Sequence, residues 1–171
     1  MTEARRIVSN TGPLISLEKL RQGYDFIRQL YDTIIIPPGV LDEVAEGQFA
    51  TPQAYLQHYG IVDLIEVQAV SRNEQLPEAA RLHVGEAQAI QLARELVLPL
   101  LIEETVGRRV AQGLGISISG IAGQILQAFR QGSLTAQEAR NKLQELFQAG
   151  RINRKIYEVL LAVIPCAAHT P

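Results

Sequence analysis

Short runs of aliphatic and β-branched residues alternate along the chain with longer segments in which apolar side chains recur at helical spacing. This alternation is typical of a parallel sheet that is covered by helices. The runs that predict strands are Arg6–Ser9, Thr33–Ile36, Leu64–Val67, Leu100–Ile102 and Ile116–Ser119. We therefore expect an α/β fold with a central parallel sheet.

Helices are predicted between and after these strands. The first has Pro13 at its N1 position and Gly23 as its stop, and the second follows Pro37-Pro38. The third opens at Gly85 and places Ala89, Leu92, Ala93 and Leu96 on one face. Further helices are predicted over Val106–Gln112 and Ile121–Arg130, whereas residues 46–60 and 71–84 carry no strong signal.

The end of the chain has the pattern of a helical hairpin. Thr135 and Glu138 have the spacing of a capping box, and Gly150 closes the helix that follows. A final helix is predicted to start at Asn153. We therefore divide the chain into an α/β domain over residues 1–132 and a helical C-terminal extension over residues 133–171, packed on the same domain.

Composition limits the classes of partner. The 171 residues carry a formal net charge of -2, which excludes attraction of the whole molecule to a polyanion. Residues 1–100 hold 8 basic and 13 acidic side chains, and residues 101–171 hold 8 and 5, so a basic surplus lies in the last third. Cys166 is the only cysteine, which excludes an intramolecular disulfide and a cysteine zinc cage. Because no run suits a signal peptide or a membrane span, we expect a cytoplasmic protein.

Polar side chains follow the predicted strands, where an open parallel sheet builds its ligand crevice. Asn10 follows the first strand, and Glu43 lies in the first turns of the helix after the second. Glu103 and Glu104 end the fourth strand. Several carboxylates in one cleft repel each other unless a cation neutralises them, and oxygen ligands select Mg²⁺ or Mn²⁺. Such clusters are the usual apparatus of phosphodiester hydrolysis.

Glu86 has the strongest pattern of these candidates. It lies in the first turn of the third helix and shares a stripe with Ile90, Ala93 and Val97, so its side chain starts near an apolar face. The positive end of the helix dipole favours its ionised form. The histidines lack any ligand spacing, and no nucleotide-binding glycine loop follows a strand.

Several stretches resemble the PIN-like domain, and more narrowly its prokaryotic branch of largely uncharacterised proteins related to the toxins of toxin–antitoxin pairs. These stretches are Ile7–Ile15, Ile34–Val44, Gly85–Ile90, and Leu100–Glu104 with Gly107–Ala111. The resemblance runs from about residue 6 to the last helix. It implies a three-layer α/β/α fold with a central parallel sheet of about five strands. It also implies an acidic pocket that in active members binds Mg²⁺ or Mn²⁺ and cleaves RNA.

Carried over position by position, the acids of the family fall on Asn10, Glu43, Glu86 and Glu103, with Glu104 beside the last. We expect the first four to be catalytic and all five to hold the metal. Asn10 and Glu103 both stand where the family has aspartate. A carboxamide oxygen still ligates Mg²⁺ but brings no charge, so weaker metal binding is expected.

Each candidate ligand also has a structural interpretation. Asparagine is common in turns at strand ends, which would explain Asn10. Glu43, considered by itself, has the pattern of an exposed helix carboxylate. Glu103 and Glu104 also suit capping charges at a helix N-terminus.

The substrate-binding candidates are Thr11, Arg108, Arg109 and Ser119. An arginine one turn after the acidic strand end suits a phosphate, but ion pairs with Glu103, Glu104 or Glu43 explain it equally well. Turn chemistry explains the two hydroxyl residues almost as well. A basic cluster near the last helix, comprising Arg151, Arg154 and Lys155, suits an RNA backbone or a solvated helix end.

The leading hypothesis is a toxin-like, metal-dependent endoribonuclease with a partly degenerate acidic site, acting on RNA as a homodimer with an antitoxin protein as partner. The alternative is a non-catalytic homodimer that binds nucleic acid or protein. Several leucines of the last helices would lie either in a dimer interface or in the core: Leu126, Leu143, Leu146, Leu160 and Leu161. A small-molecule phosphatase is a third reading of the same cluster.

Overall fold

Five parallel strands form one sheet in the computed structural model, which describes residues 2–166. From one edge to the other, the strands are β3 (Ile65–Val67), β2 (Thr33–Ile36), β1 (Arg6–Ser9), β4 (Leu100–Leu101) and β5 (Ile118–Ser119). Ile7 pairs with Ile34 of β2, and Val8 pairs with Leu100 of β4. The predicted α/β fold is confirmed.

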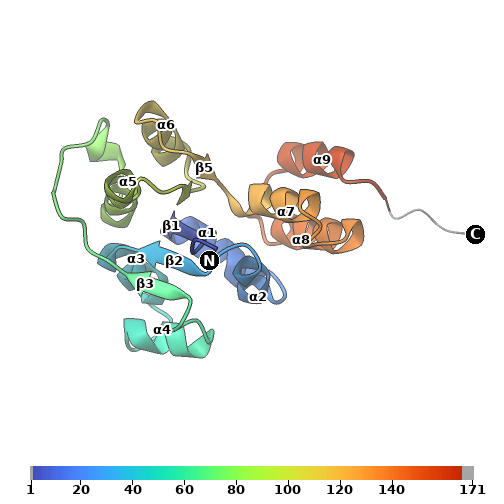
Figure 1. Cartoon of the computed structure of the whole chain (residues 1–171), viewed down its shortest axis with the longest axis horizontal. Helices are drawn as coiled ribbons and strands as arrows, with labels where there is room; N and C mark the ends of the chain where they lie inside the picture. Colours follow the sequence, from blue (N-terminus) through green and yellow to red (C-terminus); the bar gives the residue numbers. More distant parts are fainter. Residues whose placement is uncertain (1, 167–171) are drawn as a thin grey trace, which may run out of the picture.

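Helices connect and cover the strands. They are α1 (Thr11–Lys19), α2 (Gly23–Arg28), α3 (Pro38–Ala45), α4 (Pro52–His58), α5 (Val84–Leu96), α6 (Thr105–Gly113), α7 (Ile121–Arg130), α8 (Ala136–Gln148) and α9 (Arg154–Val163). α5 packs on β1 and β4, and α6 contacts β5. On the other face α1 contacts α2, α7 and α8, which gives the three-layer arrangement (Figure 1). No helix of residues 2–166 has the length and apolar character needed to cross a membrane.

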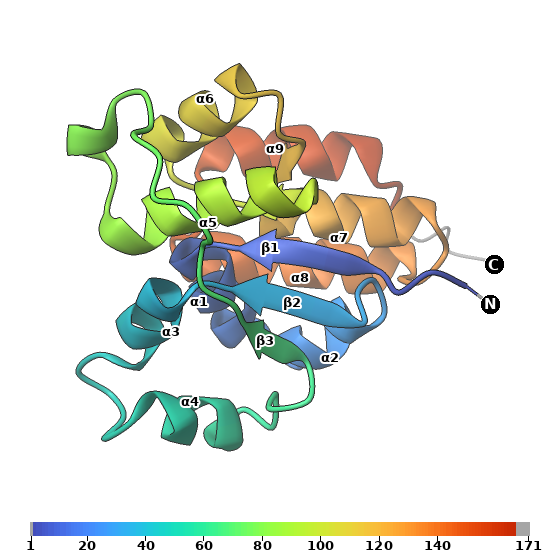
Figure 2. The same cartoon turned by 60° about the vertical axis from the view of Figure 1, so that its left-hand side comes forward.

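The carboxyl ends of the strands gather at one edge of the sheet. In Figure 2 the arrows of β1, β2 and β3 point the same way, and α1 and α3 lie beside their tips. The central strands are buried on both faces, as expected for a parallel sheet between helices: Val8, Ile34 and Leu100 are fully buried. This rigid core fixes the positions of the residues that follow each strand.

Several element boundaries differ from the prediction. α1 begins at Thr11, so Pro13 occupies its third residue and not N1. Gly23 begins α2 and does not simply end α1. A Cβ at Gly23 would lie 1.9 Å from the carbonyl oxygen of Leu17, so this turn requires glycine. α4 occupies a stretch without a sequence signal, and β4 and β5 are shorter than predicted.

The predicted C-terminal hairpin is present as α8 and α9. Thr135 Oγ1 accepts a hydrogen bond from the Glu138 amide at 3.2 Å, and Glu138 Oε2 accepts one from the Thr135 amide at 2.7 Å. This is the predicted capping box. Asn153 caps α9, which begins one residue later than predicted. α8 packs on α7, and Leu143 and Leu146 are fully buried in the core.

Candidate metal and nucleic-acid site

Asn10 directly follows β1 and is almost completely buried. Its backbone amide donates to the Leu101 carbonyl at 2.9 Å, which continues the β1–β4 ladder and fixes the residue at the carboxyl edge of the sheet. The residue is 3 % exposed. Among the described residues, no group hydrogen-bonds to its side-chain oxygen Oδ1. Most buried polar groups have partners, so this oxygen requires an explanation beyond turn formation.

Glu43 of α3 bridges two elements of the same edge. Its Oε2 accepts a hydrogen bond from the Thr11 hydroxyl at 2.5 Å, and its Oε1 accepts one from the Gly85 amide at 3.2 Å. The carboxylate is packed so closely on α5 that a Cβ at Gly85 would lie 2.6 Å from Oε1. Glu43 is thus half-buried at the edge and not freely exposed. Thr11, predicted to bind substrate, orients Glu43 in this structure.

Glu86 follows Gly85 in the first turn of α5 and is 3 % exposed. Its Oε2 accepts a hydrogen bond from the His83 amide at 3.3 Å, whereas its Oε1 has no hydrogen-bond partner within residues 2–166. Burial raises the pKa of this carboxyl, and the nearby charge of Glu104 raises it further, while the backbone amides of His83 and Gly107 act in the opposite direction. The inward position predicted for Glu86 is therefore confirmed.

The apolar stripe beneath Glu86 ends earlier than predicted. Ile90 and Ala93 are buried with it, but Val97 is 88 % exposed. Val97 adopts a left-handed backbone conformation with φ 55° at the end of α5, which turns its side chain away from the stripe. The apolar stripe still predicted the orientation of the Glu86 side chain correctly, because that orientation depends only on the first two turns of the helix.

Gly107 of α6 closes the space around Glu86. A Cβ at this position would lie 2.1 Å from Glu86 Oε1 and 2.6 Å from the side chain of Ile102. Only glycine therefore allows α6 to approach α5 at this point.

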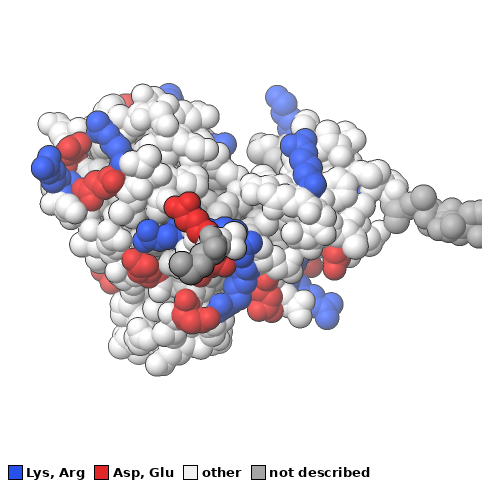
Figure 3. Space-filling model, in the orientation of Figure 1, with Lys and Arg blue, Asp and Glu red and all other residues white. Residues whose placement is uncertain are grey.

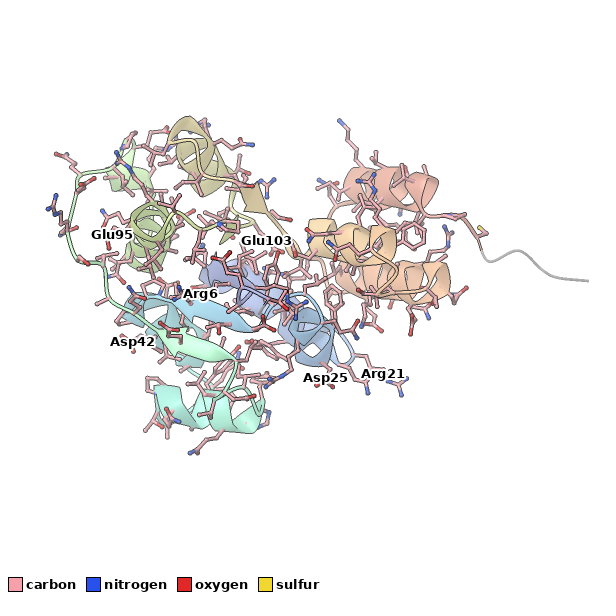
Figure 4. All side chains as sticks on the ribbon, viewed as in Figure 1. Arg6, Arg21, Asp25, Asp42, Glu95 and Glu103 are labelled. Atoms are coloured by element: carbon pink, nitrogen blue, oxygen red, sulfur yellow. The ribbon has the colours of Figure 1, made fainter. Side chains whose placement is uncertain are left out.

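Glu103 lies two residues after β4, and both of its carboxylate oxygens are already engaged. Oε2 accepts hydrogen bonds from the Ser16 hydroxyl at 2.8 Å and from Arg151 Nη2 at 3.2 Å, and Oε1 accepts one from the Ile121 amide at 3.2 Å. Glu103 lies between the α5–α6 side of the molecule and the α7–α9 side (Figure 4). Its role as a metal ligand stays a prediction. Glu104 is exposed and is the N-cap residue of α6, without a side-chain capping hydrogen bond.

The predicted basic and hydroxyl contacts have diverse partners. Arg108 donates to the Ile102 carbonyl at 2.8 Å, and Ser119 Oγ donates to the Gly120 carbonyl at 3.1 Å. Arg109 forms a bidentate ion pair with Glu78 at 2.8 and 3.1 Å. An ion pair was predicted as one alternative, but with Glu103, Glu104 or Glu43 as the partner. Phosphate binding by any of these residues stays a prediction.

The comparison with a family model decides the family. A model described as a PIN domain matches residues 6–164, which is nearly the whole chain and includes all of α8 and α9. The chain belongs to the PIN-domain family. No curated protein matches it.

One of two similar solved structures supports this fold. A PilT N-terminus domain protein from the hyperthermophilic archaeon Sulfolobus solfataricus is similar with a TM-score of 0.51 at 19% identity, over 68% of this chain and 87% of that one. A domain of a functionally unknown protein from Methanocaldococcus jannaschii has a TM-score of 0.43 at 20% identity, over 68% and 91%. At such identities the first similarity shows the fold alone.

PIN domains are typically nucleases that depend on divalent metal, so we tested whether the residues of this one fit such an ion. Residues 2–166 contain no group of three or more His, Cys, Asp or Glu side chains arranged to hold a metal. Two buried side-chain oxygens of the described residues, Asn10 Oδ1 and Glu86 Oε1, have no hydrogen-bond partner. Each is a chemically suitable donor, because oxygen atoms are the ligands that Mg²⁺ and Mn²⁺ prefer. Such oxygen donors fit a divalent ion, but they bring fewer negative charges than the four expected acids would supply.

Two residues of this PIN domain that shape the site were not singled out for it by sequence reasoning. Ser16 is a buried hydroxyl in the apolar first helix, and that misplaced polarity was a usable signal. Gly107 lies in the Gly-Arg-Arg block, where an interior helix glycine indicates a close approach. The partnership of Arg151 with Glu103, by contrast, depends on how the hairpin packs and had no local signal.

Proposed function

We propose that this PIN domain is a divalent-metal-dependent ribonuclease whose metal site is formed by Asn10, Glu43 and Glu86. The observation that carries the proposal is the pair of unpartnered buried oxygens, Asn10 Oδ1 and Glu86 Oε1. Leaving such groups unsatisfied costs about 1–3 kcal/mol each, and more for a charged group. A site that keeps both is better explained by a ligand than by packing alone.

The chain supplies distinct functions at this edge. Glu86 is held by the first turn of α5, and the backbone of Asn10 is held at the end of β1. The Thr11 hydroxyl and the Gly85 amide orient Glu43. A divalent ion bound there would lower the pKa of a bound water and screen the charge of a phosphodiester. Mg²⁺ and Mn²⁺ are the proposed ions.

Glu103 and Glu104 receive lesser roles in this proposal. Glu103 anchors the C-terminal hairpin through Arg151, and that ion pair offsets the negative charge of Glu103. Glu104 adds negative potential near Glu86 without a contact of its own. We therefore assign metal binding chiefly to Glu86, Glu43 and Asn10.

RNA is the proposed substrate. A toxin-like role with an antitoxin protein as partner, and a homodimeric state, rest on the family resemblance and are proposals of the same kind. Light scattering of the purified chain tests the dimer: a mass of twice 18.8 kDa supports it and a mass of 18.8 kDa contradicts it.

Cleavage of single-stranded RNA tests the central function. We expect the wild-type chain to cleave in Mn²⁺ or Mg²⁺ and to lose activity in EDTA. Glu86→Gln keeps the shape of the side chain but removes its charge, so it should reduce the rate by at least ~100-fold. Glu95→Gln, an exposed residue of the same helix outside the site, is the matched control. Equal rates for wild type and Glu86→Gln would refute the proposal.

A second function is favoured by a specific observation. Asn10 is uncharged and Glu103 is paired with Arg151, so two of the four expected acids add no free charge. A non-catalytic PIN domain that binds nucleic acid fits such a site. RNA binding without metal-dependent cleavage, unchanged in Glu86→Gln, would favour this second function.

A further inference from the structure

A cleft of about 660 Å³, lined in part by Glu103, lies between the α6–β5 region and α9. Its size falls within the roughly 300–1,000 Å³ of typical small-ligand sites. Glu103 contributes to its wall, as do Thr105 and Ser119 near the carboxyl edge of the sheet. The cleft is therefore continuous with the strand ends that carry the proposed site.

The charges that line the cleft are complementary to phosphate. Arg108, Arg151 and Lys155 face it, whereas Glu103 is the one acidic residue lining it within the described part of the chain. Arg151 neutralises Glu103 at 3.2 Å, which leaves the charges of Arg108 and Lys155. Figure 3 shows basic side chains projecting from the end of the molecule that α9 forms.

The walls of the cleft are mainly aliphatic. Ile156 and Val159 of α9 are 43 % and 58 % exposed, although exposed apolar side chains at consecutive turns of one helix are unfavourable in water. Tyr157 of α9 is stacked on Phe147 with ring centroids 4.7 Å apart and parallel planes. Aliphatic side chains, and not an aromatic ring, are thus available in the cleft.

We propose that this cleft binds one unstacked nucleotide of a single-stranded RNA, with the base between the aliphatic side chains of α9 and the phosphate on Arg108 and Lys155. The inference rests on the proposed function, because it places this nucleotide beside the cleavage site. An aliphatic wall accepts the face of any base, and single-stranded bases are free to leave the stack. A protein segment without acidic groups would leave both cations unpaired, so the charges favour the nucleotide.

Binding of a fluorescein-labelled single-stranded RNA of ~8 nucleotides, measured by anisotropy in EDTA, tests this cleft without cleavage. Val159→Asp places a carboxylate in the wall and should weaken binding on the order of tenfold. Val163→Asp, on the same helix but outside the cleft and 49 % exposed, should leave binding unchanged. Both positions are exposed, so circular dichroism should show folded variants.

A charge pair gives a second, independent test. Lys155→Glu should weaken binding and lower the salt dependence of log K by about one unit. Arg154→Glu changes the same charge one residue earlier, outside the cleft, and should have a smaller effect. An abasic nucleotide series in the same RNA should show one position whose base is required.

Equal RNA affinity in wild type, Val159→Asp and Lys155→Glu would overturn the proposal. A change of oligomeric state in Val159→Asp at constant RNA affinity would also overturn it, because the cleft would then be a subunit contact. These results are separate from the proposed function. Glu86→Gln cleaving as fast as wild type would refute the proposed metal site at Glu86 while leaving the anisotropy result intact.

Discussion

Arg151, in the turn between α8 and α9, lies 3.2 Å from Glu103 at the end of β4, although 48 residues separate them along the chain. The same guanidinium donates to the Ser16 hydroxyl at 2.9 Å and to the Gly12 carbonyl at 3.0 Å. The hairpin is therefore tied to the first turns of α1 and to the sheet by one side chain. Its attachment and the charge of the pocket depend on the same contact.

Loss of this contact should destabilise the protein. In Arg151→Ala the half-buried Glu103 loses its charged partner, which we expect to cost about 2 kcal/mol in the free energy of unfolding. Urea denaturation measures the change. Arg154→Ala is the control, because its pair with Glu158 is exposed and 3.9 Å long. Equal losses in the two variants would contradict the anchoring role.

Gly107 should be intolerant of any side chain. Gly107→Ala places a Cβ 2.1 Å from Glu86 Oε1, so either α6 or Glu86 must move. We expect a loss of about 1–3 kcal/mol in stability together with weaker Mn²⁺ binding by calorimetry. Gly113→Ala at the end of the same helix meets no atom within 4 Å and should be neutral or stabilising. Unaltered Mn²⁺ binding in a folded Gly107→Ala would show that this packing does not position Glu86.

Asn10→Asp should strengthen metal binding and weaken the metal-free protein. A second buried carboxylate raises the charge that a cation neutralises, so Mn²⁺ affinity should rise on the order of tenfold. Without metal the added carboxylate is buried without a neutralising partner, and the melting temperature should fall until Mn²⁺ restores it. Asn73→Asp, an exposed change, is the control. An Mn²⁺ affinity that does not change would mean that no ion contacts this position.

A buried network on α1 should make stability depend on pH. Burial raises the pKa of Glu18 above its ordinary value of 4.5, against the opposing hydrogen bond from the Tyr55 hydroxyl. The folded state therefore binds this proton more tightly than the unfolded chain does. Its contribution is complete below pH 4.5 and is lost as the pH rises through the folded pKa.

Glu18→Gln keeps an acceptor for Tyr55 and removes this titration. The melting temperature of Glu18→Gln, relative to that of wild type, should rise between about pH 4 and pH 7, because Glu18 of the wild type loses its proton over this range. Glu46→Gln, at an exposed position, should track wild type throughout. A constant offset between Glu18→Gln and wild type across this range would contradict the assignment.

The local pattern of apolar and polar residues was sufficient to predict the central strands and the inward position of Glu86. β1 and β2 have the predicted bounds because four consecutive strand-forming residues end at Asn10 or Pro37 in each case. Glu86 was placed inward because one helical stripe determines its direction. The fold of the α/β region follows from such signals, which act over a few residues.

Contacts between segments distant in the sequence could not be predicted from these local signals. Arg109 pairs with Glu78 across a loop that carried no pattern, and Arg151 reaches Glu103 only because the hairpin packs beside α1. Likewise α2 begins at Gly23 because of a close approach to the Leu17 carbonyl, which sequence reading treated as a simple stop. Such features depend on docking geometry, so they require coordinates.

Diffraction from a crystal soaked in Mn²⁺, with the anomalous signal of the ion, tests the central claim most directly. The account predicts one anomalous peak at the carboxyl edge of the sheet, 2.0–2.6 Å from both Asn10 Oδ1 and Glu86 Oε1, the distance range of oxygen ligands to such ions. It also predicts that the peak is absent in Glu86→Gln. A fully soaked crystal without a peak between these two oxygens, or with its peak elsewhere, would contradict the account.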